Sequence, residues 1–119
     1  MRTPVEISLR GVPASGALER LVGEQARQLE RQCERVQACH VTVEALHREQ
    51  QPGAQFAVRL NIMLPGTEVV VNREHGEDVY MAVREAFEAA GLQLSDHMRR
   101  QGSIERRSRS ANPGGKQGR

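Results

Sequence analysis

Apolar and polar residues alternate in four short stretches of this chain and recur at helical spacing in two longer ones. The alternating stretches are residues 5–10 (VEISLR), 39–46 (CHVTVEAL), 56–64 (FAVRLNIML) and 68–73 (EVVVNR). An alternating pattern is typical of a strand that buries one face, so these stretches predict four strands. Helical spacing predicts one helix from Ser15, its expected N-cap, to about Arg35, and a second from about Glu77 to Arg100.

The predicted order along the chain is strand, helix, strand, strand, strand, helix. A helix connects the first two strands, which are therefore expected to be parallel, whereas the last two strands form a hairpin and are expected to be antiparallel. Each strand and each helix has only one apolar face, so both helices are expected to cover the same side of the sheet. The predicted fold class is α+β, a two-layer β-α-β-β-β-α sandwich with a mixed four-stranded sheet whose other side faces water.

The composition predicts one folded domain and a tail. A chain of 119 residues is long enough for one two-layer core, and we assign residues 1–101 to it. Residues 102–119 contain a single large aliphatic side chain, Ile104, among Arg, Ser, Gly and Pro, so they are expected to be disordered in isolation. No apolar run approaches the roughly 20 residues of a membrane helix and the N-terminus has no signal sequence, which favours a cytoplasmic location.

Charge is distributed unevenly between these two parts. Residues 1–97 contain 10 basic and 14 acidic side chains, a net charge of −4, whereas residues 98–119 contain 7 and 1, a net charge of +6. A basic tail on a mildly acidic body suits an anionic partner such as nucleic acid, although basic tails also occur in proteins without a defined target.

The chain lacks the residue clusters that catalysis or metal binding requires. The four histidines are scattered without an HExxH or CxxC grouping, at His40, His47, His75 and His97. The two cysteines, Cys33 and Cys39, are expected to be reduced structural thiols. Glu77 and Asp78 are better explained as acidic residues at a helix N-terminus than as an acid–base pair. We therefore expect no enzyme activity, no metal or other cofactor, and no small-molecule substrate.

Arginine side chains on the two predicted helices are candidates for binding RNA. Arg20, Arg27 and Arg31 cluster opposite the apolar face of the first helix. On the second helix, a strip along the edge of the apolar face contains Tyr80, Arg84, Gly91 and Ser95 and ends near Arg99 and Arg100. These rows are either solvated faces with i,i+4 ion pairs or a surface for double-stranded RNA, which is recognised by its shape and phosphates.

Two further features concern the open face of the sheet and the second helix. No aromatic residue is expected on the open face of the sheet, which excludes base stacking there. Gly91 costs helix stability, and close approach of another backbone is one reason to tolerate a glycine at that position.

Three segments together resemble the hibernation-promoting factor and ribosome-associated inhibitor proteins, also called the sigma-54 modulation family. They are residues 17–31 (ALERLVGEQARQLER), 56–74 (FAVRLNIMLPGTEVVVNRE) and 77–94 (EDVYMAVREAFEAAGLQL). The resemblance covers residues 4–100, and the E-D-x-Y-x-A-[IV] run at residues 77–83 is its most specific part. It implies a sandwich akin to double-stranded RNA-binding domains, without enzyme activity. It also implies a monomer that binds the small ribosomal subunit and its rRNA across the mRNA and transfer RNA sites during stress or stationary phase.

The resemblance further implies which side chains contact ribosomal RNA. They are Arg20, Arg27, Arg31, Asp78, Tyr80, Arg84, Arg99 and Arg100 on the helices. Because the body of this chain has a net negative charge whereas relatives are more basic, we separately expect part of the binding to lie in the tail, at Arg106, Arg107, Arg109, Lys116 and Arg119. Tyr80 can stack on a base or donate its hydroxyl, and Arg84 can form two hydrogen bonds with a phosphate. Two alternatives stay open, because Asp78 also suits a helix cap and Tyr80 also suits the edge of the core. Alternative functions are general binding of structured RNA and modulation of a sigma factor.

Overall fold

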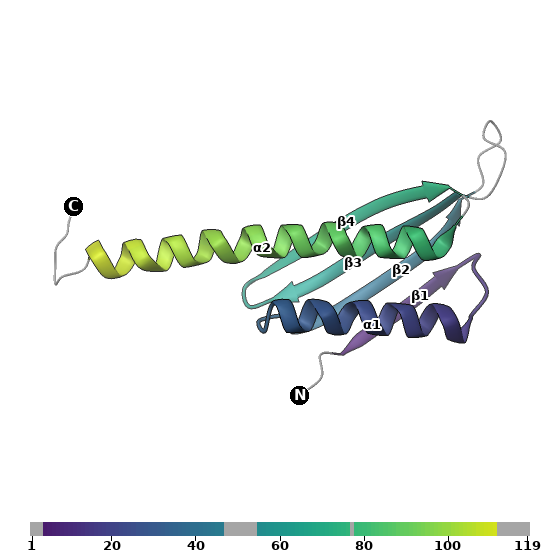
Figure 1. Ribbon diagram of the computed structural model, residues 1–119, viewed down its shortest axis with the longest axis horizontal. Coiled ribbons are helices and arrows are strands. Elements are labelled where there is room, and N and C mark those ends of the chain that lie inside the picture. Colours follow the sequence, from purple (N-terminus) through teal and green to yellow (C-terminus); the bar gives the residue numbers. More distant parts are fainter. Residues whose placement is uncertain (1–3, 47–54, 77, 112–119) are drawn as a thin grey trace.

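The predicted order of elements is confirmed by the computed structural model, which describes residues 4–46, 55–76 and 78–111, with side chains described up to residue 100. The elements, shown in Figure 1, are β1 (Val5–Arg10), α1 (Gly16–Gln32), β2 (Ala38–Leu46), β3 (Gln55–Leu64), β4 (Thr67–Gly76) and α2 (Val79–Ala111). Within the described residues, neither helix has an apolar stretch long enough to cross a membrane.

The four strands form one mixed sheet in the order β1-β2-β3-β4. β1 pairs with β2 in parallel, with Val5 opposite Cys39, because α1 carries the chain back between them. The other two pairs are antiparallel, and they place Leu60 of β3 between Val41 of β2 and Val71 of β4. The chain turns from β3 to β4 at Gly66, whose φ of 76° is a left-handed conformation that favours glycine.

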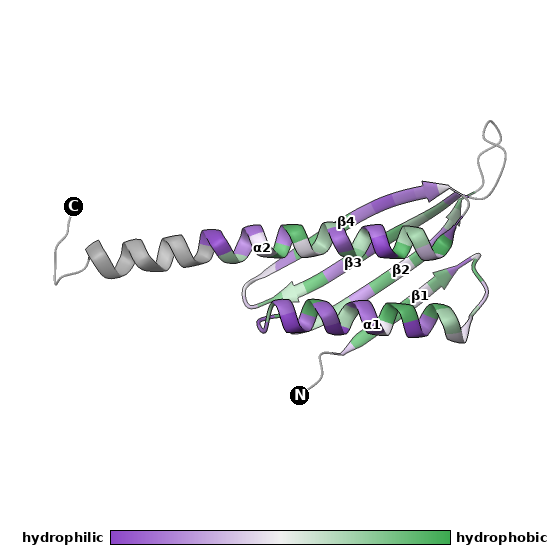
Figure 2. Ribbon diagram, viewed as in Figure 1, coloured by the Kyte–Doolittle hydropathy of each residue, from purple (hydrophilic) through white to green (hydrophobic). Residues whose placement is uncertain are grey.

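Both helices cover the same face of the sheet, which confirms the predicted fold class. In Figure 1, α1 lies over the β1 and β2 side, α2 lies over the β3 and β4 side, and both helices begin at the same end of the sheet. Figure 2 shows hydrophobic positions recurring along the strands and helices, as expected for elements that bury one face each. The largest fully buried side chains come from both layers: Leu18, Val22, Val41, Leu60, Ile62, Val83 and Leu94.

Helix α1 begins where the sequence predicts and ends three residues earlier. The Ser15 backbone is extended, and its hydroxyl oxygen accepts a hydrogen bond from the Leu18 N–H at 3.3 Å. At the other end, Cys33 has left the helical conformation, with φ −138° and ψ 105°. Val36 and Cys39 are both buried. Because the helix ends at Gln32, the chain can bury these two side chains as it enters β2.

Helix α2 is longer than predicted. It continues to Ala111, so the prediction of disorder from residue 102 is wrong for residues 102–111. This stretch has one poor helix former, Gly102, whereas Arg, Glu, Ser and Ala extend an existing helix more easily than they start a new one. The remainder of the predicted tail, residues 112–119, lies outside the described residues. The assignment of residues 1–101 as the functional domain stays a prediction.

Candidate nucleic-acid interface

The arginine row on α1 lies on the exposed side of the helix. Arg20, Arg27 and Arg31 are all exposed, and the opposite side of α1 buries Leu18 and Leu29 in the core. Their predicted location is therefore confirmed, whereas their role stays a prediction. Residues 16–35 contain four arginines and four glutamates, so the row is a local concentration of positive charge on a helix without net charge.

Asp78 is the N-cap of α2. One of its carboxylate oxygens, Oδ1, accepts hydrogen bonds from the backbone N–H groups of Tyr80 at 2.9 Å and Met81 at 3.3 Å. A carboxylate at this position also interacts favourably with the positive end of the helix dipole. The capping alternative for Asp78 is thus confirmed, and the structure gives its carboxylate a role that needs no RNA.

Tyr80 and Arg84 have different environments although they lie one turn apart. Tyr80 is partly buried and packs against the hydrophobic core, which confirms that it closes the edge of the core. Arg84 is exposed. Their predicted roles as RNA contacts stay predictions.

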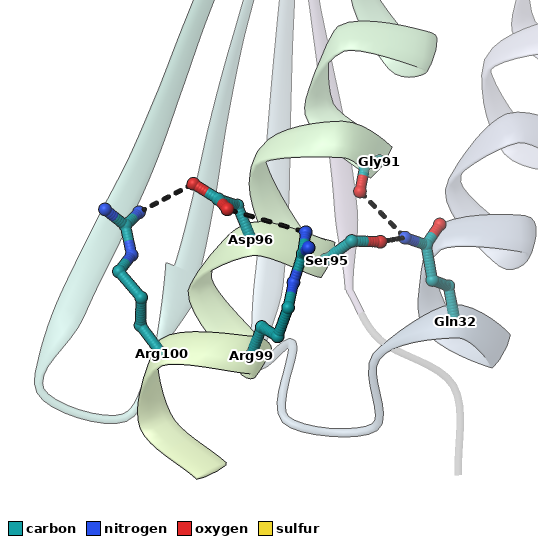
Figure 3. Close-up of polar contacts among 6 residues, drawn as sticks. All are labelled: Gln32, Gly91, Ser95, Asp96, Arg99 and Arg100. Atoms are coloured by element: carbon teal, nitrogen blue, oxygen red, sulfur yellow. Dashed lines mark hydrogen bonds and ion pairs between the residues drawn. The ribbon is translucent and has the colours of Figure 1, made fainter. Parts of the chain in front are cut away.

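Gln32, at the end of α1, connects the two helices at Gly91 and Ser95 of α2 (Figure 3). Its side-chain Nε2 donates to the Gly91 carbonyl oxygen at 2.8 Å and to the Ser95 hydroxyl oxygen at 2.7 Å. A Cβ atom at Gly91 would lie 3.2 Å from the Gln32 Oε1, tighter than an ordinary contact. A group does approach Gly91 closely, but it is the end of the Gln32 side chain and not the backbone that the sequence suggested.

The arginines further along α2 are already engaged with an acidic neighbour. Arg99 and Arg100 lie 3.5 and 3.3 Å from the Asp96 carboxylate. Figure 3 draws both ion pairs. All three side chains are more than half exposed, so each ion pair stabilises the protein by at most about 1 kcal/mol. Arg106, Arg107 and Arg109 belong to the part of α2 for which no side chain is described.

A cleft of about 360 Å³ lies between α1 and α2. Its α1 wall contains Gln25, Gln28 and Gln32, and its α2 wall contains Phe87, Glu88 and Leu92. Sequence reasoning missed this cleft, because its width depends on the distance between two helices. The only available signal was the spacing of the three glutamines, which places them on one side of α1.

Two further sets of residues lie away from the helix surfaces. They are polar side chains on the open face of the sheet and the two buried cysteines. On the open face the Ser8 hydroxyl lies 2.8 Å from Nε2 of His40, and Asn61 donates to the Glu68 carboxylate at 2.9 Å. Both cysteines are free thiols in the core, and burial raises the pKa of the Cys39 thiol to about 11. Among the described residues, no group of three His, Cys, Asp or Glu side chains could hold a metal ion.

Comparison with known proteins adds a family and two similar structures. A family model described as sigma 54 modulation protein / S30EA ribosomal protein matches residues 5–102. A ribosomal subunit interface protein from Coxiella burnetii has the same fold, with a TM-score of 0.66 and 21% identity over 81% of this chain and 98% of that chain. The Protein Y N-terminal domain from Thermus thermophilus gives a TM-score of 0.60 and 20% identity over 82% and 99%. No curated protein sequence matches the chain.

Proposed function

The chain belongs to the sigma 54 modulation protein / S30EA ribosomal protein family, and from this membership we propose that it binds the small ribosomal subunit and silences translation during stress or stationary phase. The folded domain would occupy the sites of messenger and transfer RNA and exclude both sterically. The fold that the chain shares with a protein named for the ribosomal subunit interface supports this proposal.

The observation that carries the proposal is the exposed row of Arg20, Arg27 and Arg31 on α1. These side chains lie on the side of α1 that faces away from the sheet, so RNA can approach them without disturbing the core. A guanidinium group forms two parallel hydrogen bonds with a phosphate. Each phosphate that is neutralised also releases counterions, which gives an affinity that falls steeply with salt.

The start of α2 supplies a second set of contacts in this proposal. Arg84 pairs with a phosphate, and the exposed edge of Tyr80 donates its hydroxyl to RNA. Asp78 acts indirectly, because its carboxylate caps the helix and so holds the Tyr80 backbone in place. A carboxylate would repel a phosphate, which is why we assign Asp78 a positioning role.

The C-terminal half of α2 extends the basic surface along the chain. Arg99 and Arg100 can exchange the Asp96 carboxylate for phosphate at small cost, because exposed ion pairs are weak. Arg106, Arg107 and Arg109 follow on the same helix. We propose that these five arginines bind rRNA together with those on α1.

Sedimentation with purified ribosomal subunits tests the proposal. We expect the protein to sediment with the small subunit in a sucrose gradient and to prevent initiator transfer RNA from binding at a comparable concentration. A protein that stays at the top of the gradient would reject the proposal. Equal affinity for an unrelated RNA duplex would instead favour general binding of structured RNA.

A further inference from the structure

We propose that the cleft between α1 and α2 holds one unpaired nucleobase of the bound RNA, with a preference for guanine. The inference rests on the proposed function, since it requires RNA on the helix side of the domain. The cleft volume of about 360 Å³ is at the small end of the range for small-ligand pockets, which suits a single base better than a larger group.

Of the large apolar side chains that line the cleft, Leu92 is the exposed one, and it offers its surface to one face of a base. Leu29 and Phe87 are buried, whereas Leu92 is 70% exposed. Gly91 adds no side chain to this surface, and its carbonyl group is held by Gln32. Covering Leu92 with a planar base would remove apolar area from water.

Gln32 joins the two helices at the cleft and has no amide hydrogen left to donate to a base. Its amide nitrogen has two hydrogens, and the Gly91 carbonyl and Ser95 hydroxyl accept both of them. These bonds cross from α1 to α2 (Figure 3), and all three residues line the cleft. The remaining polar groups, the amides of Gln25 and Gln28 and the carboxylate of Glu88, are left to recognise the edge of a ligand.

The Glu88 carboxylate is the group that favours guanine. Glu88 is exposed, and among the side chains that the structure describes it forms no ion pair. A carboxylate only accepts hydrogen bonds, and guanine presents two adjacent N–H donors on its Watson–Crick edge, which two carboxylate oxygens can bind together. Uracil presents a single donor between two acceptors, so it would leave one oxygen unpaired and place the other near a repelling carbonyl group.

The charges around the cleft favour RNA over a peptide as its occupant. Arg84 precedes Glu88 by one turn on α2, and Arg31 follows Gln28 by three residues on α1. Both arginines are exposed, so a nucleotide whose base enters the cleft finds cationic groups for the phosphates on either side. A lone carboxylate among phosphates would be repulsive, and this repulsion is offset only if the carboxylate accepts hydrogen bonds from the base.

Replacement of Glu88 by glutamine gives a test in which the two explanations have opposite signs. Glu88→Gln removes one negative charge, so contact with phosphates alone predicts unchanged or tighter binding to the small subunit. Loss of a bidentate base contact predicts binding that is weaker by roughly 10-fold. The matched control is Glu6→Gln, which makes the same charge change on the open face of the sheet and should leave the affinity unchanged.

A second measurement uses single-stranded RNA oligomers that compete with the subunit. We expect an oligomer rich in guanosine to bind the wild-type protein roughly 10-fold more tightly than one rich in uridine, and Glu88→Gln to lose this preference. Wild-type protein that binds the subunit while Glu88→Gln binds equally or more tightly would overturn the cleft proposal and leave the proposed function intact. Wild-type protein that fails to bind the subunit would overturn the proposed function itself.

Discussion

The salt dependence of ribosome binding should change when the arginine row on α1 is shortened. The double variant Arg27→Ala, Arg31→Ala removes two exposed guanidinium groups that face away from the core. If each binds one phosphate at about 1 kcal/mol, affinity at low salt falls about 30-fold. Each lost contact also makes the negative slope of log K against log salt shallower by about 0.9, so the magnitude of the slope should fall by about 1.8.

Sedimentation at several salt concentrations measures this slope directly. Between 50 and 200 mM salt, a slope difference of about 1.8 means that wild-type affinity falls roughly 10-fold more than that of the variant. Arg59→Ala is the matched control, because Arg59 is an exposed arginine on the open face of the sheet and removing it should leave the slope unchanged. Equal slopes for the wild type and the double variant would refute the assignment of Arg27 and Arg31 to phosphate.

Three other predictions concern stability and the C-terminal residues. Asp78→Ala removes the N-cap of α2 and should lower the free energy of unfolding by about 1 kcal/mol in a urea titration; unchanged stability would contradict the capping role. The Cys39 thiol has its pKa raised from 9.0 to about 11 in the folded state, so the unfolded state ionises first as pH rises. The free energy of unfolding should fall by about 2 kcal/mol between pH 9 and 11, and a Cys39→Ala variant with the same decline would contradict this. Deleting residues 102–119 should weaken ribosome binding and its salt dependence without changing thermal unfolding of the folded domain; full, salt-sensitive affinity would show that the tail is not used.

The fold could be predicted from residue patterns because each pattern is compatible with only one kind of element. Alternation in residues 5–10 and 56–64 leaves a strand only one face to bury, and a helix between two strands requires them to be parallel. Ser15 had a clear role as a cap, which the bond to the Leu18 N–H confirms. The extension of α2 to Ala111 was missed because composition alone does not distinguish a new helix from the continuation of one.

The candidate site was less predictable, because its parts depend on distances between elements. Exposure of Arg27 and Arg31 follows from helical periodicity within α1 alone. The choice between two roles for Asp78 required hydrogen-bond geometry, which depends on the three-dimensional structure. The approach of Gln32 to Gly91 joins residues 59 positions apart, and no local pattern in the sequence predicts such a contact.

The attachment of both helices to a single sheet has a consequence for the kinetics of association. The backbone positions of the α1 and α2 arginines relative to one another are established on folding, before any partner arrives. Binding then restricts mainly arginine rotamers, at about 0.5–1.5 kcal/mol for each immobilised side chain, and does not have to order the backbone beneath them. We therefore expect an encounter that needs no slow rearrangement of this domain, so that its rate is governed by diffusion and electrostatic steering.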